Sequence, residues 1–166
     1  MRTGIALGSN VGDRMSHLRS GRERILGIPA VTEPMLCSAV YETEPVGLGA
    51  GSDPFLNAVV EVEFSGYSGE LLDALQEIEA EHGRPSKRPR NAPRTLDLDI
   101  LYVGNLALTN QEIVIPHPRL HLRRFVLTPL ADIRPELVLP GQHRPVGALL
   151  ADVKDATSVE MHAAIW

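Results

Sequence analysis

Cysteine is almost absent from the sequence, and long hydrophobic runs are absent altogether. The single cysteine, Cys37, excludes an internal disulfide and a cysteine-rich zinc site. It lies in the apolar run MLCSAVY, which favours a buried and unreactive thiol. The sequence contains no stretch of about 18 apolar residues, and it does not begin with a basic segment followed by an apolar one. We therefore expect a cytoplasmic protein that neither spans a membrane nor is secreted.

Positive charge and the common phosphate-binding motifs are also scarce. The chain has 16 Lys and Arg against 21 Asp and Glu, a formal net charge of -5 at pH 7, which argues against a general nucleic-acid binder or a membrane-surface protein. It lacks the GxxxxGKS/T loop of P-loop kinases and the HRD and DFG elements of protein kinases. Its 166 residues, of which 43% are hydrophobic, predict one domain spanning residues 1–166.

Hydrophobic periodicity predicts alternating strands and helices. Strands are expected at residues 3–7, 31–41, 58–64 and 95–103. Helices are expected at residues 15–26 and between Ser68, which would cap the second helix, and Gly83. Shorter elements are expected after these: a strand at 112–115, helices at 122–130 and 148–153, and a tail at 157–166 that is either an edge strand or a packed segment. The order β-α-β-β-α-β followed by a helix is an α+β layout.

The stretch PRTLDLDI, residues 93–100, places two aspartates in a predicted strand, where Asp is unfavourable. Side chains at i and i+2 of a strand share one face about 6.6 Å apart, so Asp97 and Asp99 would project together, opposite the neighbouring leucines and Ile100. Paired carboxylates of this kind suit Mg²⁺, which keeps several waters and takes further ligands from substrate phosphates. The alternative is a strand with one solvated polar face.

Immediately upstream, residues 84–94 read RPSKRPRNAPR and carry five cations and no acidic residue. Arginines bind phosphate oxygens bidentately, so this segment beside a carboxylate pair predicts phosphate binding. Mutual repulsion of the cations further predicts that residues 83–94 close over the phosphates only when substrates are bound. The alternatives are a solvated loop and a nucleic-acid patch, although the segment has no aromatic residue that could stack on bases.

Several motifs occur together in one order: GSN after the first strand, YETEPVG, FLNAV, IEAEHGR, PRTLDLDI and PHPRLHLRRFVLTPL. From about Gly8 to Pro135 they resemble the 6-hydroxymethyl-7,8-dihydropterin pyrophosphokinase family of folate biosynthesis. The resemblance implies an ATP-dependent diphosphotransferase that moves pyrophosphate from Mg-ATP to the pterin hydroxymethyl group and releases AMP. It also implies a single-domain three-layer α-β-α fold with a ferredoxin-like β-α-β-β-α-β core and a mainly antiparallel sheet.

The resemblance assigns roles to individual residues. Asp97 and Asp99 would bind two Mg²⁺ ions, and they would form the catalytic set together with Arg84 and Arg94. The implied ATP-binding residues are Glu79, Arg84, Lys87, Arg94, Ile100, His117 and Arg123. The implied pterin-binding residues are Thr43, Pro45, Val46, Phe55, Asn57, Asp97 and Phe125, with the two phenylalanines sandwiching the ring.

Some alternatives stay open at the level of sequence. Arg124 is the neighbour of Arg123 and could face the phosphates in its place, and Glu79 could lie on a solvated helix face. The whole chain could be a catalytically silent nucleotide- or anion-binding module, although the intact aspartate pair argues against that. It could also be an ordinary phosphotransferase that releases ADP. The expected partners are small molecules, and neither nucleic acid, nor a membrane, nor a partner protein is indicated.

Overall fold

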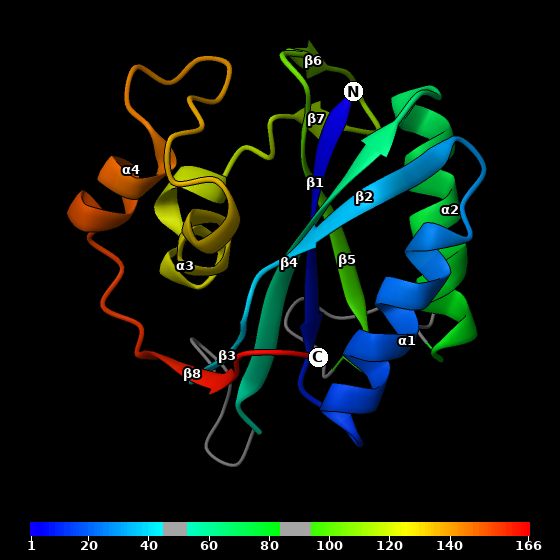
Figure 1. Ribbon diagram of the computed structural model, residues 1–166, viewed down its shortest axis with the longest axis horizontal. Helices are drawn as coiled ribbons and strands as arrows, with labels where there is room; N and C mark the ends of the chain where they lie inside the picture. Colours follow the sequence, from blue (N-terminus) through cyan, green and yellow to red (C-terminus); the bar gives the residue numbers. More distant parts are fainter. Residues whose placement is uncertain (45–52, 84–93) are drawn as a thin grey trace.

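The computed structural model describes residues 1–44, 53–83 and 94–166. The elements follow one another in the order β1 (Arg2–Ser9), α1 (Arg14–Leu26), β2 (Val31–Cys37), β3 (Val40–Thr43), β4 (Phe55–Phe64), α2 (Ser68–Glu81), β5 (Asp97–Val103), β6 (Leu108–Thr109), β7 (Val114–Ile115), a 3-10 turn (Leu120–Leu122), α3 (Arg124–Ile133), α4 (Val146–Asp152) and β8 (Val159–Ala163). Figure 1 shows their arrangement.

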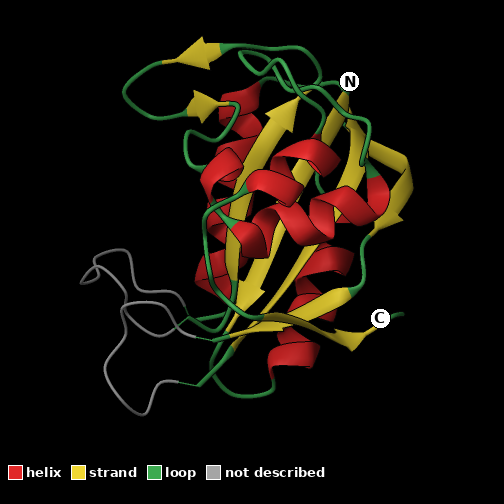
Figure 2. Ribbon diagram, turned by 90° about the vertical axis from the view of Figure 1, so that its left-hand side faces the viewer, coloured by secondary structure: helices red, strands yellow, loops and turns green. Residues whose placement is uncertain are grey.

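The main sheet has six strands in the order β5-β1-β4-β3-β8, with β2 also paired to β4. Every pairing between its described strands is antiparallel. Helices α1 and α2 cover one face, whereas α3 and α4 lie on the other (Figures 1 and 2). The three-layer α+β fold with a mainly antiparallel sheet is therefore confirmed. None of the described helices has the length and hydropathy needed to cross a bilayer.

Strand β4 shows how the alternation of side chains divides the sheet into two faces. The residues that pack in the core beneath α1 and α2 are Leu56, Ala58, Val60, Val62 and Phe64. The residues between them face α3: Val59 packs against that helix, and Asn57 and Glu61 place polar groups on the same face. The site described below occupies the Asn57 end of this face.

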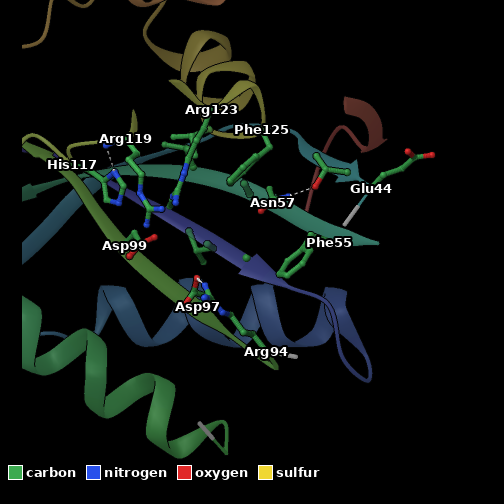
Figure 3. Close-up of a pocket in the computed structure, with 17 residues that line it drawn as sticks. Glu44, Phe55, Asn57, Arg94, Asp97, Asp99, His117, Arg119, Arg123 and Phe125 are labelled. Carbon is green, nitrogen blue, oxygen red and sulfur yellow. Dashed lines mark hydrogen bonds and ion pairs between the residues drawn. The ribbon is translucent and has the colours of Figure 1, made fainter. Parts of the chain in front are cut away.

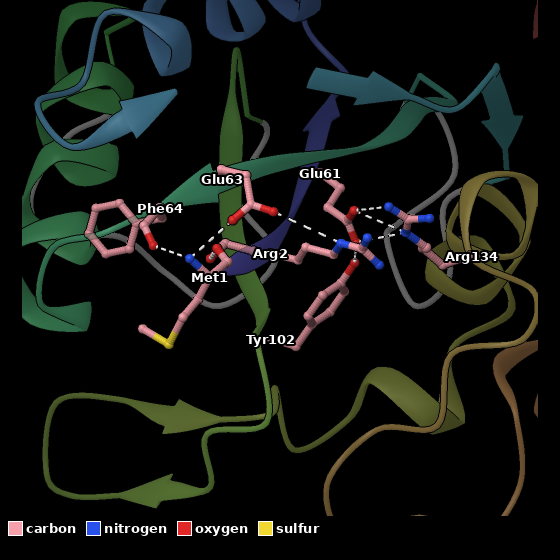
Figure 4. A network of polar contacts seen from close by, with 8 residues as sticks. Met1, Arg2, Glu61, Glu63, Phe64, Tyr102 and Arg134 are labelled. Carbon is pink, nitrogen blue, oxygen red and sulfur yellow. Dashed lines mark hydrogen bonds and ion pairs between the residues drawn. The ribbon is translucent and has the colours of Figure 1, made fainter. Parts of the chain in front are cut away.

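A buried polar cluster occupies the Glu61 end of the same face (Figure 4). The Arg134 guanidinium, at the end of α3, donates to Glu61 at 2.5 Å through Nη2 and at 2.9 Å through Nε. The Tyr102 hydroxyl of β5 donates to the same carboxylate. Gly4 of β1 leaves room for the Tyr102 ring, because a Cβ there would lie 2.2 Å from the ring. The cluster therefore joins β4, β5 and the C-terminal end of α3.

Residues 31–41 form two strands, so the prediction of a single strand was wrong. The break falls at Ser38, which is buried. The Ser38 backbone N–H donates to the Val59 carbonyl at 2.9 Å, while the Val59 N–H donates to the Ser38 hydroxyl at 2.9 Å. The side-chain oxygen thus replaces a backbone carbonyl in the ladder and creates a bulge between β2 and β3.

Cys37 is exposed, and the prediction of a buried thiol was also wrong. It ends β2, whose only pairing in the described part of the chain is with β4, and it is the one exposed residue of the apolar run. The tail combines the two predicted alternatives. Strand β8 pairs with β3 at the edge of the sheet, and Trp166 is buried, with its indole N–H donating to the Ser38 carbonyl at 2.8 Å.

Two helix boundaries differ from prediction. Helix α2 begins at Ser68 after Tyr67, so Ser68 is not its cap. The Tyr67 N–H instead donates to the Glu70 carboxylate at 3.1 Å, which satisfies a donor at this helix end. Helix α3 begins at Arg124 and continues through Pro129 to Ile133. Pro129 removes one backbone donor without ending the helix.

Candidate active site

A cavity of about 490 Å³ opens on the α3 face of the sheet, where β1 ends and β4 and β5 begin (Figure 3). Nine of the predicted site residues line it: Thr43, Phe55, Asn57, Arg94, Asp97, Asp99, His117, Arg123 and Phe125. These residues span 82 positions of the chain, from position 43 to position 125, and the strand order of the sheet brings them together.

The floor of the cavity is formed where three strands run side by side. Gly8 of β1 is in register with Asn57 of β4 and with Asp97 of β5. A Cβ at Gly8 would lie 3.3 Å from the Asn57 side-chain oxygen. Only a residue without a side chain leaves the space between the amide and the carboxylate open.

Asp97 and Asp99 lie on the cavity side of β5, as predicted from their spacing, whereas Leu98 and Ile100 pack in the core on the opposite face. Asp97 forms an ion pair with the guanidinium of Arg94. Burial and the neighbouring Asp97 raise the pKa of Asp99, although the nearby cations act in the opposite direction. Two neighbouring, partly desolvated carboxylates on one face of a strand could hold a cation.

The aspartate pair fits Mg²⁺ better than a metal that needs an all-protein set of ligands. Among residues 1–44, 53–83 and 94–166, no group of three His, Cys, Asp or Glu side chains could hold a metal ion. Hard oxygen ligands in this small number suit Mg²⁺, which completes its octahedron with water and phosphate oxygens. The donor set therefore agrees with a metal that arrives with a phosphorylated substrate.

Glu79 of α2 lies beneath β5 and does not line the cavity. It is buried, and its carboxylate accepts a hydrogen bond of 2.7 Å from the backbone N–H of Leu98, the residue between the two aspartates. β5 lies at the edge of the described sheet, and Glu79 supplies an acceptor for this N–H. The alternative of a solvated helix face is thereby excluded. Ile100 likewise lies in the core and not on the cavity wall.

Arg94 is fixed by Asn10, whose role the sequence did not reveal. The Asn10 side-chain oxygen accepts from the Arg94 backbone N–H at 2.7 Å, and the Asn10 N–H donates to the Arg94 carbonyl at 2.9 Å. Asn10 is itself buried. The GSN motif at the end of β1 therefore serves to hold the residue that pairs with Asp97.

His117 follows β7 and is anchored to β5 by its backbone N–H, which donates to the Leu101 carbonyl at 2.8 Å. The Arg119 N–H donates to its Nδ1 at 3.2 Å, which leaves Nε2 to carry the proton of a neutral ring. Burial lowers the pKa of His117, although the nearby Asp99 carboxylate opposes this. Neutral His117 can therefore donate a hydrogen bond to an anionic ligand at physiological pH.

Arg123 lines the cavity and Arg124 does not, which decides between the two alternatives. The Arg123 guanidinium lies over the ring of Phe125, with its carbon 5.5 Å from the ring centre. Figure 3 shows the Arg123 side chain on the same side of the cavity as His117 and Arg119. Cationic and neutral donors thus gather above the aspartate pair.

The other end of the cavity is aromatic and amide-lined. Phe125 and Phe55 approach it from α3 and β4, with Asn57 between them (Figure 3). The Asn57 amide nitrogen donates to the Thr43 hydroxyl at 2.8 Å, and both side chains are buried. This bond fixes the amide so that its oxygen points toward Gly8 and the cavity.

Two charged residues that line the cavity were missed from the sequence, Glu44 and Arg119. Arg119 stands two residues after His117 in the PHPR motif, and that spacing could have indicated it. Four predicted site residues lie outside the described residues: Pro45, Val46, Arg84 and Lys87. The same holds for nearly all of the segment 83–94 that was expected to close over the phosphates.

Comparisons with known proteins identify the family of the chain. A family model described as 7,8-dihydro-6-hydroxymethylpterin-pyrophosphokinase matches residues 4–135. The 2-amino-4-hydroxy-6-hydroxymethyldihydropteridine pyrophosphokinase of Bacillus subtilis is 44% identical over 129 residues, which cover 78% of this chain and 75% of that protein. The protein of the same name from Haemophilus influenzae is 40% identical over 82% of this chain and 84% of its own length.

A solved structure shows the same fold at low identity. The HPPK-DHPS protein of Plasmodium falciparum, crystallised with pteroate, superposes with a TM-score of 0.70 over 90% of this chain at 14% identity. This chain spans 42% of that longer one. The family match over most of the chain and the close bacterial relatives confirm the resemblance found in the sequence motifs. The chain belongs to the 7,8-dihydro-6-hydroxymethylpterin pyrophosphokinase family.

Proposed function

We propose that the chain transfers pyrophosphate from Mg-ATP to 6-hydroxymethyl-7,8-dihydropterin, giving the pterin diphosphate and AMP in a step of tetrahydrofolate biosynthesis. The observation that carries this proposal is the division of one cavity into two chemically different ends. Asp97, Asp99 and several cations line one end, whereas Phe55, Phe125 and Asn57 line the other. A polyanion and a flat heterocycle would therefore meet between them.

The aspartate end suits the nucleotide. Arg94, Arg119 and Arg123 offer guanidinium donors, and neutral His117 offers Nε2–H, to the oxygens of a triphosphate. When bound at Asp97 and Asp99, two Mg²⁺ ions would neutralise phosphate charge and lower the pKa of the attacking hydroxyl. In the bound state Arg94 can exchange its ion pair with Asp97 for phosphate oxygens.

The aromatic end suits the pterin. Phe55 and Phe125 can stack on the two faces of a bicyclic ring, an arrangement favoured by offset packing of aromatic systems. The oriented oxygen of Asn57 can accept a hydrogen bond from the ring's amino or ring N–H groups. The hydroxymethyl group would then point along the floor at Gly8 toward Asp97.

In the reaction, the hydroxymethyl oxygen bonds to the β-phosphorus, and the bond between that phosphorus and the oxygen bridging to the α-phosphate breaks. The departing group is AMP, and the hydroxyl proton is lost to an aspartate or to solvent. Arg94, Arg123 and His117 would bind the equatorial oxygens and so keep the attacking and leaving oxygens in line, and positioning and charge neutralisation would supply most of the catalysis.

The proposal is tested by incubating the purified chain with Mg-ATP and 6-hydroxymethyl-7,8-dihydropterin and separating the nucleotides. AMP formed in equal amount to pterin diphosphate is the expected result, and it should disappear when the pterin is omitted. Formation of ADP would indicate ordinary phosphotransfer. Tight binding of both ligands without any nucleotide product would indicate a silent binding module.

A further inference from the structure

The C-terminal segment reaches back to the active site through Asp155. This residue lies beyond positions 4–135, which the family model matches. One oxygen of its carboxylate accepts from the Arg124 backbone N–H at 2.9 Å. The Arg124 side chain also binds this segment: its Nε donates to the Asp155 carbonyl at 2.8 Å, and its Nη2 donates to the Val153 carbonyl at 3.3 Å. Residue 124 is therefore held through both its backbone and its side chain.

Asp155 is itself held in place. Its second carboxylate oxygen accepts from the Thr157 N–H at 3.0 Å and from the Thr157 hydroxyl at 2.5 Å. Burial raises the pKa of Asp155, but the hydrogen bonds from Thr157 and Arg124 outweigh this effect and lower the pKa overall. The side chain is thus an ionised carboxylate with both oxygens engaged.

The hydrogen bonds between Asp155 and Arg124 lie next to two residues of the cavity wall. Arg124 is the first residue of α3 and lies between Arg123 and Phe125, which both line the cavity. Among the described residues, α3 has no acidic side chain in its first turn and no side-chain cap of its own. Asp155 therefore supplies from a distant segment the negative charge and the acceptor that a helix N-terminus favours.

The opposite end of α3 has separate anchors. Arg134 binds Glu61, and Asp132 accepts from the Tyr41 hydroxyl at 2.8 Å. These contacts fix the C-terminal half of the helix against the sheet. Loss of the Asp155 contact would consequently leave the helix in place and release mainly its first turn.

Resting on the proposed function, we infer that Asp155 is a positioning residue for pyrophosphate transfer: through Arg124 it holds Arg123 and Phe125 in the geometry that binds phosphate and pterin. Without it, the turn at residues 123–125 samples other conformations. Only the fraction of molecules in the competent conformation then binds, and the apparent dissociation constant rises as that fraction falls.

The test is the affinity for 6-hydroxymethylpterin, measured by calorimetry or pterin fluorescence well below the melting temperature, with wild type, Asp155→Ala and Asp155→Asn. The alanine variant should bind about ten-fold more weakly. The asparagine variant keeps an acceptor for the Arg124 N–H and should recover most of the affinity. Asp152→Ala is the matched control, because it removes an exposed ion pair with Arg144 in the same C-terminal segment and should bind as wild type does.

A purely structural role would lower the melting temperature of Asp155→Ala without changing the dissociation constant of its folded molecules, and that result would overturn the inference. If the alanine variant does not fold, Thr157→Val takes its place. It removes the hydroxyl that orients Asp155 and should weaken pterin binding about three-fold, whereas unchanged affinity would again overturn the inference. AMP formation by the wild type is assayed separately, so failure of this inference and failure of the proposed function give different results.

Discussion

Asn57 of β4 and Asp97 of β5 face one cavity from the two sides of strand β1, and Gly8 is the β1 residue in register with both. A Cβ at Gly8 would lie 3.3 Å from the Asn57 oxygen and 4.0 Å from the Asp97 Cβ. The missing side chain keeps the amide end and the carboxylate end of the cavity continuous. The attacking hydroxyl of the proposed reaction would have to pass over this point.

Gly8→Ala should therefore impair catalysis while preserving the fold. The added methyl group forces Asn57 to shift by a few tenths of an ångström, and misplacement at a reacting centre is costly, so we expect kcat/KM for the pterin to fall about ten-fold or more. Gly69→Ala in α2 is the matched control, because a Cβ there meets no atom within 4 Å. Steady-state kinetics of Gly8→Ala that match those of the control would contradict the role of the floor.

Asp99→Asn should separate activity from stability. Turnover should fall about 100-fold or more, since the carboxylate would hold the metal ion that binds the phosphates. The melting temperature without Mg²⁺ and nucleotide should stay equal or rise, because burial and Asp97 disfavour the charged form of Asp99 and raise its pKa. Thermal denaturation with and without Mg-ATP checks both parts. A variant that retains turnover would refute the ligand role.

Glu61 should govern stability in acid. Burial raises its pKa, but the hydrogen bonds from Arg134 and Tyr102 outweigh burial and lower the pKa below its unfolded value. The folded state then binds fewer protons than the unfolded state, so the stabilisation is complete above the unfolded pKa of about 4.3 and is lost as pH falls through the folded pKa. Glu61→Gln should lower the free energy of unfolding by about 1.5–3 kcal/mol at neutral pH. Its further loss of stability in acid should be smaller than that of the wild type.

The control for Glu61 is its neighbour on the same strand. Glu63 pairs with the N-terminus and Arg2, and its side chain is 42% exposed. Glu63→Gln should change stability by no more than about 0.5 kcal/mol. Denaturant unfolding of both variants between neutral and acid pH is the measurement. Parallel pH profiles for wild type and Glu61→Gln would show that this carboxylate does not control acid stability.

Glu79→Ala should act through β5. It leaves the Leu98 N–H between the two aspartates without its acceptor, at a cost of about 1–3 kcal/mol, and it should lower kcat more than it changes the KM for ATP. Glu77→Ala, an exposed position on the same helix, is the control. A large rise in KM for ATP with unchanged kcat would instead indicate direct contact between Glu79 and the nucleotide.

The sequence predicted the β-α-β-β-α-β core because each element has a clear hydrophobic period. It also predicted that Asp97 and Asp99 share a face, since strand geometry alone determines this. It did not predict the break at Ser38, where one hydroxyl replaces a carbonyl in the ladder and local propensity carries no sign of it. Nor did it predict that Cys37 is exposed, because the burial of a residue at the end of β2 depends on how distant parts of the chain cover it.

Site residues that belong to a sequence motif could be predicted, whereas residues that act through tertiary contacts could not. His117 and Arg123 lie in the PHPRLHLRR motif, and both line the cavity. The reciprocal hydrogen bonds between Asn10 and Arg94 join residues 84 positions apart, and those between Arg124 and Asp155 join residues 31 positions apart. Such contacts depend on chain topology, which residue type and spacing do not encode.

In the proposed reaction, ATP and the pterin bind in one cavity and the β-phosphorus of ATP becomes bonded to the pterin hydroxymethyl oxygen. The destination of that phosphorus is therefore the most direct test. The chain would be given ATP labelled at the β-phosphate together with 6-hydroxymethyl-7,8-dihydropterin and Mg²⁺, and the products would be separated. We predict that the label moves entirely to the pterin product and that the AMP formed is unlabelled. Label recovered in ADP, with a singly phosphorylated pterin, would contradict the account.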